Sequence, residues 1–272
     1  MNKLLTSLLL LGSVSAFAAE HSEFKQFNNE YNIGYQFSQM DLINGSQQVT
    51  QVNQQAINLE VEHLFDLGIW FDINLNMVTN YSQPTLGPDY LNGGSGGQGT
   101  GAAGDQAYAF GQNPFMYSFN VKGGYAFSLL DDKMQIIPYI TFGRNSNWSS
   151  STIVANGYQP LSNDYFLTGG LGTRLSYRFD NTLMLYADEL YNYNWDNSGA
   201  IKTIQTDIYG KSYAATNYQM ITTVGVKYNF THDIQLGLSG FWNNYQHQSN
   251  IAGMVYTPQN TFGEMITIGL TY

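Results

Sequence analysis

The sequence predicts an all-β protein, a closed antiparallel up-and-down β-barrel that spans a membrane, with ten strands and with eight or twelve as alternatives. Three observations lead to this fold class. Apolar residues alternate with small or polar ones in ten runs, which is the period of a β-strand. Five runs close on an aromatic pair or its equivalent, just before a short polar turn or the chain end. Only 11% of the residues are charged, against about 25% in a typical soluble domain, and a surface that faces lipid would explain this deficit.

The N-terminus predicts a cleaved secretory signal peptide at residues 1–18. Lys3 gives one positive charge, an apolar stretch runs from Leu4 to about Phe17, and small residues precede the predicted cleavage before Ala19. The stretch is shorter than the about 20 residues that a membrane-spanning helix needs. Residues 19–272 are therefore expected to form one barrel domain that crosses the membrane only as strands.

The ten runs predict the strands. They lie near residues 29–40, 55–65, 68–81, 114–128, 134–144, 164–179, 182–194, 216–230, 233–244 and 261–272. The polar face of these runs carries mostly Asn, Gln, Ser, Thr and Gly, which is typical of a narrow lumen and unlike the Lys and Glu of a solvated surface. The fifth run contains Pro138, which cannot donate to a ladder and predicts an edge or a bulge there.

The connections fall into two classes that alternate strictly. Four are short: Asp66-Leu67, Leu129 to Lys133, Asp180-Asn181 and Thr231-His232. Five are long, near residues 41–54, 82–113, 145–163, 195–215 and 245–260. This alternation predicts periplasmic turns and extracellular loops, with both termini on the periplasmic side. The glycine-rich stretch 92–101 lacks the strand-to-helix context of a phosphate cradle and is expected to be a flexible loop.

The few charges of the strands are predicted to share the inward face. This predicted lumen charge network consists of Glu60, Glu62, Asp72, Lys122, Arg174, Arg178, Asp188 and Lys227. A Lys or Arg that faced lipid would cost about 2–4 kcal/mol near the midplane of the membrane, so these charged side chains are expected to point into the lumen. Two interpretations stay open: the charges pair and hold a packed interior together, or they form a constriction for small solutes.

Glu189 and Glu264 fall on the lipid face. Each lies about eight residues from the periplasmic end, so either it sits near the outer rim or a bulge shifts its phase.

The closing aromatic residues predict a girdle at the periplasmic interface, where amphipathic rings prefer the headgroup level. The predicted girdle consists of Phe65, Tyr125, Phe127, Tyr177, Phe179, Tyr228, Phe230 and Tyr272. A second girdle on the outer side is predicted at Phe37, Tyr81, Phe115, Tyr191, Tyr193, Trp242 and Phe262.

The sequence predicts neither catalysis nor a metal or cofactor site. His247 is the histidine placed in an outer loop, and the acids Asp41, Asp164, Asp196 and Asp207 show no informative spacing to it. No calcium-binding spacing appears, and the absence of cysteine excludes disulfides and thiolate sites. A formal charge of −10 argues against nucleic acid as a partner.

The signal peptide, the glycine-rich stretch Gly169-Gly170-Leu171-Gly172 and the closing segment 266–272 resemble small outer-membrane β-barrel proteins of Gram-negative bacteria. That superfamily includes opacity-type surface antigens and OmpA-like barrels. The resemblance implies an outer-membrane location, contact with lipid and lipopolysaccharide, and insertion by the barrel assembly machinery. It also implies that alternate residues of the last strand form the assembly signal, here Ile266, Ile268, Leu270 and Tyr272, with Tyr in place of the usual terminal Phe. No peptidoglycan-binding domain is expected after the barrel.

These observations favour a non-enzymatic surface protein, with a structural, antigen or adhesion-type role that uses its extracellular loops to meet a host or surface ligand. The alternative is a narrow pore through a charged lumen. A less favoured alternative is an omptin-like protease or a lipid hydrolase, since omptins are also ten-stranded, but their acidic pair and Asp-His pair are not found here.

Overall fold

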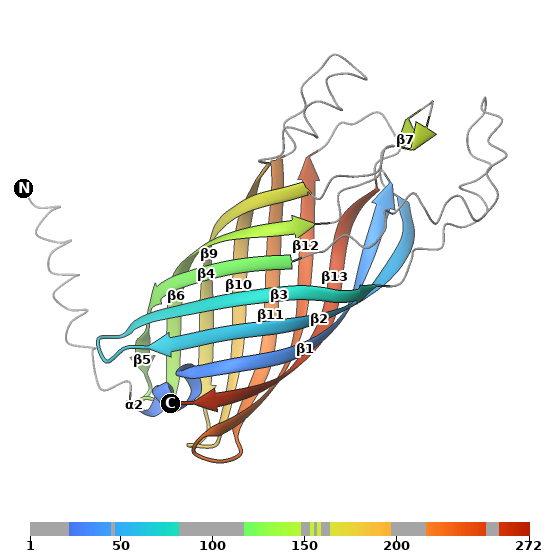
Figure 1. Ribbon diagram of the computed structural model, residues 1–272. Helices are drawn as coiled ribbons and strands as arrows, with labels where there is room; N and C mark the ends of the chain where they lie inside the picture. The colour runs from blue at the N-terminus through green and yellow to red at the C-terminus, as the bar shows by residue number, and fades with distance from the viewer. Residues whose placement is uncertain are drawn as a thin grey trace, which may run out of the picture.

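The computed structural model describes residues 22–44, 47–81, 117–147, 153–154, 157–158, 164–196, 216–248 and 256–272. Its described part is a closed barrel of ten antiparallel strands, as predicted from the sequence (Figure 1). The strands are β1 (Glu30–Asn44), β2 (Gln47–Leu64), β3 (Ile69–Tyr81), β4 (Tyr117–Tyr125) with β5 (Phe127–Leu129), β6 (Met134–Asn147), β9 (Asp164–Arg178), β10 (Leu183–Asp196), β11 (Thr216–Asn229), β12 (Ile234–Gln248) and β13 (Tyr256–Thr271). Each strand pairs with its neighbour in sequence, and β1 pairs with β13 to close the barrel.

Two short pieces are not part of the closed sheet. β7 (Ile153–Val154) and β8 (Gly157–Tyr158) pair with each other in a separate two-stranded sheet. The helix α2 (Ser22–Asn28) precedes β1. Among the described residues no helix is long and apolar enough to cross a membrane. The predicted signal peptide lies outside the described residues.

The first long loop was predicted wrongly. Residues 41–54 belong mostly to β1 and β2, whose ladder continues until Asn44 lies opposite Gln47. The sequence there is rich in Gln, Asn and Ser, so it lacks the apolar alternation that marked the other strands. Main-chain pairing does not require that alternation, and it extends this hairpin beyond its apolar part. The ladder has a register shift between Leu42 and Ile43.

A break between β4 and β5 lies opposite Pro138. Gly124 pairs with Tyr139 before the break and Phe127 pairs with Ile136 after it, so the register is the same on both sides. The sequence analysis predicted an edge or a bulge at Pro138, and this was wrong, because β6 pairs on both sides with an unchanged register. The proline, which has no N–H to donate, lies opposite a break in the neighbouring strand instead. The N–H of Ala126 in the break donates to the carbonyl of Gly68, 2.7 Å away.

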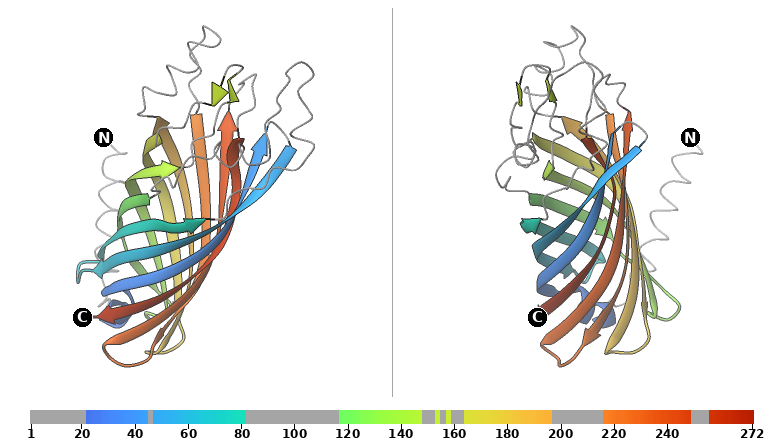
Figure 2. Two further views of the ribbon diagram at one scale, coloured as in Figure 1. Left: turned by 45° about the vertical axis from the view of Figure 1, so that its right-hand side comes forward. Right: turned by 90° about the vertical axis from the view of Figure 1, so that its right-hand side faces the viewer.

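The four short turns lie at the end of the barrel that holds α2 and the C-terminus (Figure 2). In the turn after β5, Leu130, Asp131 and Asp132 have φ values of 54°, 51° and 59°. This left-handed conformation is unusual for residues other than glycine. In the turn before β10, the hydroxyl and N–H of Thr182 donate to Asp180 and hold the pKa of that exposed carboxyl below its ordinary value.

The outer surface of the barrel is apolar, which is the arrangement that a lipid environment requires. Large apolar side chains point outward on every strand of the closed sheet, among them Ile33 (56% exposed), Leu171 (67%), Val224 (59%) and Ile266 (61%). Polar side chains point inward at the alternating positions.

Inward-facing glycines make room for large inward side chains on the next strand. Tyr139 lies opposite Gly172, Tyr186 opposite Gly225 and Phe241 opposite Gly263. A Cβ atom at Gly172 would lie 2.2 Å from the ring of Tyr139. The glycine-rich strands therefore set the space available in the lumen.

Candidate functional site

The mouth of the barrel beside the short turns is filled by α2, an element that the sequence analysis did not predict. This end is predicted to face the periplasm and is called the periplasmic mouth below. Phe24 and Phe27 of this helix are fully buried. They belong to one apolar cluster with inward-facing side chains of the strands, namely Leu64, Trp70, Ala126, Ile137, Tyr139, Met184 and Leu190. The spacing of Phe24 and Phe27, three residues apart, places both rings on one face of a helix, and this was the available signal.

Polar contacts fasten this helix and the residue that follows it to the barrel wall. The side chain of Asn28 donates to Gln135 (2.9 Å), and the N–H of Leu64 donates to the side chain of Asn29 (2.6 Å). Glu23 pairs with Arg178, and Lys25 pairs with Asp66. The helix is thus joined to strands and turns on several sides of the mouth.

Above the helix, the buried carboxylate of Glu62 accepts hydrogen bonds from three side chains. Trp70 Nε1 lies 2.8 Å and Arg174 2.9 Å from its Oε1, and Lys227 Nζ lies 2.8 Å from its Oε2. Lys227 also pairs with Glu30 and donates to the carbonyl of Phe27 at 2.9 Å. Lys227 therefore links the ion pairs of the strands directly to the helix that fills the mouth.

A second group of charges lies beside the first. Lys122 Nζ is 2.9 Å from Asp72 and 3.9 Å from Asp188. The hydroxyl of Tyr139 donates to Asp188. The guanidinium of Arg174 lies 4.5 Å from the ring centre of Tyr186, a cation–π contact. The two groups meet at the rings of Trp70 and Tyr139, whose centres are 5.5 Å apart. We call the residues Glu30, Glu62, Asp72, Lys122, Arg174, Asp188 and Lys227 the inner ion-pair layer.

Two residues of the predicted charge network lie apart from this layer. Arg178 is at the mouth, where it pairs with Glu23 and donates to Asn181 at 2.7 Å. Glu60 lies farther from the mouth along β2 than Glu62, accepts a hydrogen bond from Asn32 at 3.2 Å, and has no ion-pair partner in the described part of the chain. The sequence analysis missed Glu30, although it alternates in phase with Asn32 and so shares the inward face.

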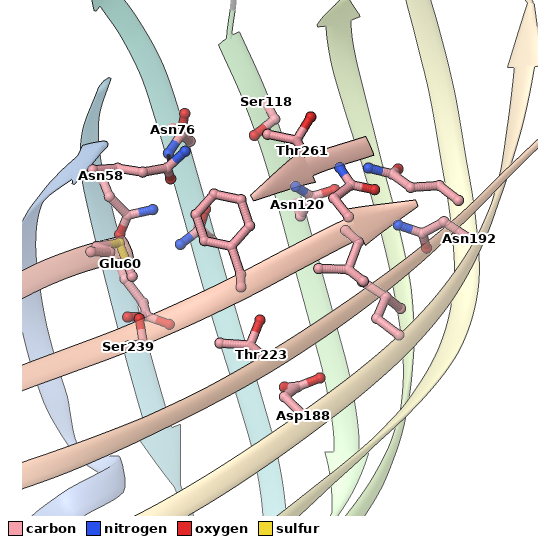
Figure 3. Close-up of a pocket in the computed structure, with 18 of the residues that line it drawn as sticks. Asn58, Glu60, Asn76, Ser118, Asn120, Asp188, Asn192, Thr223, Ser239 and Thr261 are labelled. Atoms are coloured by element: carbon pink, nitrogen blue, oxygen red, sulfur yellow. Dashed lines mark hydrogen bonds between the residues drawn. The ribbon is translucent and has the colours of Figure 1, made fainter. Parts of the chain in front are cut away.

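A polar cavity of about 300 Å³ occupies the outer half of the lumen (Figure 3). Its walls include amide side chains from seven strands: Gln36, Gln54, Asn58, Asn74, Asn76, Asn120, Asn192, Gln219 and Asn243. Glu60 and Asp188 also line it, with Lys122, Arg174 and Lys227 of the inner ion-pair layer. In Figure 3, Asn58 and Glu60 lie on one side of the space and Asn120 and Asn192 on the other. The inner ion-pair layer is the floor of this cavity.

The two acids predicted on the lipid face do point outward. Glu189 is exposed and accepts a hydrogen bond from Thr222 at 2.6 Å, and Glu264 is exposed between Phe37 and Gly240 of the neighbouring strands. The ladders that hold them show no register shift between either acid and the periplasmic ends of their strands. The alternative of a bulge is therefore wrong, and a position near the outer rim stays the prediction.

The residues of the predicted outer girdle are only partly described. Phe37, Tyr191, Trp242 and Phe262 are exposed on the outer surface, and the rings of Trp242 and Phe262 stack with centres 6.2 Å apart. Tyr193 is half-buried and packs on Tyr218. Phe115 lies outside the described residues, as does the side chain of Tyr81.

The predicted periplasmic girdle occupies the rim beside the short turns. Six of its members are exposed: Phe65, Tyr177, Phe179, Tyr228, Phe230 and Tyr272. Tyr125 and Phe127 are half-buried, with ring centres 5.0 Å apart. Tyr272 stacks on Tyr31 with ring centres 4.7 Å apart. The predicted assembly residues Ile266, Ile268 and Leu270 all point outward on β13.

No protein-family model and no curated protein sequence matches the chain. Several solved outer-membrane β-barrels are similar in fold. The β domain of the Bordetella autotransporter BrkA is 10% identical with a TM-score of 0.48, covering 90% of this chain and 100% of that one. The Escherichia coli outer-membrane protease OmpT is 11% identical with a TM-score of 0.40, covering 90% of this chain and 97% of that one. Neisserial surface protein A is 11% identical with a TM-score of 0.31, covering 88% of this chain and 94% of that one. At these identities the likeness concerns the barrel fold and brings no activity to this chain.

Proposed function

We propose that this chain is an integral outer-membrane protein whose barrel is closed at the periplasmic mouth and whose role is performed from the extracellular side. The role is that of a surface protein, structural, antigenic or adhesive, and its ligand is met by the loops and the outer half of the lumen. Its partners are membrane lipid and lipopolysaccharide, the assembly machinery during insertion, and a host or surface ligand. The proposal contains no catalytic step.

The observation that carries the proposal is the filling of the periplasmic mouth. The fully buried rings of Phe24 and Phe27 occupy this end, and the inner ion-pair layer lies directly above them. A solute crossing the barrel would have to displace the helix and then break buried ion pairs. Breaking a buried pair by removing one partner typically costs about 3–5 kcal/mol, which makes such a path unfavourable.

Planar-bilayer recording of the purified mature protein tests this closure. We expect no discrete conductance steps from the wild-type barrel once its insertion is established by flotation with lipid vesicles. Discrete steps from the wild-type barrel that change in amplitude on Arg174→Ala would overturn the closed mouth and favour the narrow pore. Folding of the variant is checked by its heat-sensitive mobility in gel electrophoresis.

The surface role has a separate test. Cells that display the wild-type protein should bind a host or matrix preparation, and removal of at least one long connection should abolish that binding. Unchanged binding after each of the long connections has been shortened in turn would remove adhesion from the proposal.

A further inference from the structure

The amide groups of the outer cavity present unused hydrogen-bonding atoms. The side-chain oxygens of Asn58, Asn120, Asn192, Gln219 and Asn243 are buried and have no partner in the described part of the chain. Four of these residues are at least nine-tenths buried, with exposed fractions of 3% for Asn58, 2% for Asn192, 4% for Gln219 and 8% for Asn243. Buried polar atoms in folded proteins are nearly always paired, so this concentration in one cavity points to a ligand.

The charges around the cavity are unequal. Two carboxylates, Glu60 and Asp188, and three cations, Lys122, Arg174 and Lys227, line it. Three further carboxylates, Glu30, Glu62 and Asp72, pair with these cations from outside the lining, so the whole group has two more carboxylates than cations. Each of the three cations has a carboxylate within 4.0 Å. In the described part of the chain, the carboxylate of Glu60 accepts a hydrogen bond from the amide of Asn32 and has no cation partner, and it lines the cavity above the inner ion-pair layer. The excess negative charge disfavours an anionic ligand and favours a cation at Glu60.

The remaining walls suit the carbon skeleton of a sugar. Phe241, Leu190, Ile221 and Met265 line the same space and offer apolar contact to C–H groups. An amide carries one acceptor and one donor end, so it can bind hydroxyl groups in either direction. A volume of about 300 Å³ is at the small end of the range for small-molecule sites, which suits one sugar unit. In the described residues no group of three His, Cys, Asp or Glu side chains could hold a metal ion.

We propose that the outer cavity binds a small hydroxylated amine of the amino-sugar class, with its ammonium group on Glu60 and its hydroxyl groups on the luminal amides. The inference rests on the proposed function, because it places the ligand in the outer half of a lumen that is closed below. Its test measures binding and not conductance, so the two can fail separately. A conducting barrel that still binds the amine would overturn the closed mouth and leave this site intact.

Three sugars that differ mainly in charge provide the test. Glucosamine, glucose and glucuronate are titrated by calorimetry into the purified full-length mature barrel in detergent. We expect glucosamine to bind about tenfold or more tightly than glucose, which is the effect of one charge-assisted hydrogen bond, and glucuronate to bind least. Equal affinity for glucosamine and glucose would overturn the role of Glu60. Absence of binding by all three, or tightest binding of glucuronate, would overturn the site.

Variants separate the site from general charge effects. Glu60→Gln keeps the size of the side chain and its acceptor for Asn32, and should reduce the affinity for glucosamine to that for glucose. The matched control is Glu264→Gln, which removes the same charge from the outer surface of the barrel and should leave both affinities unchanged. Equal losses in the two variants would overturn the assignment of the ammonium to Glu60. Heat-sensitive gel mobility shows that each variant is folded.

Discussion

The two halves of the lumen are built by the same strands but are filled differently. In the inner half, the carboxylate of Glu62 meets Trp70, Arg174 and Lys227, and apolar rings from α2 fill the mouth below it. In the outer half, amide side chains line a cavity, and the oxygens of five of them have no partner in the described residues. The inner half therefore has the composition of a stabilising core, and the outer half has that of a binding site.

Glu60 and Glu62 show how close the stabilising half of the lumen lies to the half that has the composition of a binding site. They are the same residue type on the same face of β2, two positions apart. Glu62 has an indole and two cations around it, whereas Glu60 has one amide. Neighbouring strands thus decide whether an inward acid contributes to stability or is available to a ligand.

The largest expected effect comes from removing the acid at the centre of the inner ion-pair layer. Glu62→Ala leaves Arg174 and Lys227 buried without their shared carboxylate, and we expect it to lower the free energy of unfolding by about 3–5 kcal/mol. Urea unfolding in lipid vesicles, followed by tryptophan fluorescence, measures the change. Trp70 loses its acceptor in this variant, so its emission should also shift.

The matched control is Glu60→Ala, two residues away on the same strand. Because this side chain has no ion-pair partner in the described part of the barrel, its loss should cost far less than that of Glu62. Equal destabilisation by the two variants would contradict the division of the lumen into a stabilising half and a binding half.

A smaller effect is expected from filling the space that a glycine provides. Gly172→Ala places a methyl group 2.2 Å from the ring of Tyr139, whose hydroxyl is held by Asp188. Overpacking of this kind typically costs about 1–3 kcal/mol, and here it would press on the inner ion-pair layer. The same urea unfolding experiment measures it.

Gly123→Ala is the control for this substitution, since a Cβ atom at Gly123 would have no atom within 4 Å. We expect a change near zero. A stability loss at Gly123 as large as that at Gly172 would mean that the strand glycines act through backbone conformation and not through the space they leave.

The barrel could be predicted from the sequence because its signals are local. Alternation of side chains, turn lengths and the closing aromatic residues each depend on a few neighbouring positions. The outer part of the first hairpin could not be predicted in this way, because residues 41–44 and 47–54 pair in the ladder although their sequence lacks the apolar alternation of the other strands. The alternation that marked the other strands is a property of the lipid-facing surface and ends where that surface ends.

The site was less predictable than the fold. The alternation of apolar and polar residues along each strand predicted that the charged side chains point inward. The contact between Glu62 and Arg174, which are 112 residues apart, depends on closure of the barrel and could not be predicted in this way. The helix α2 is seven residues long and carries only two apolar side chains, so its pattern is too short to be distinguished from a loop. Its position in the mouth follows from the apolar residues Leu64, Ile137 and Met184, which face the lumen from three separate strands.

The smallest expected effect comes from an ion pair at the rim, and it tests how the helix is held in the mouth. Lys25 of α2 pairs with Asp66 of the first short turn, whose side chain is 88% exposed. Solvent-exposed pairs contribute about 0–1 kcal/mol, so Asp66→Asn should lower the free energy of unfolding by no more than that, and less at high salt. The same measurement on Glu23→Gln removes the partner of Arg178, which is 8% exposed, and should give the larger loss of the two. If Asp66→Asn instead destabilised the barrel as much as Glu62→Ala, the rim pair and not the buried rings would hold the helix in place.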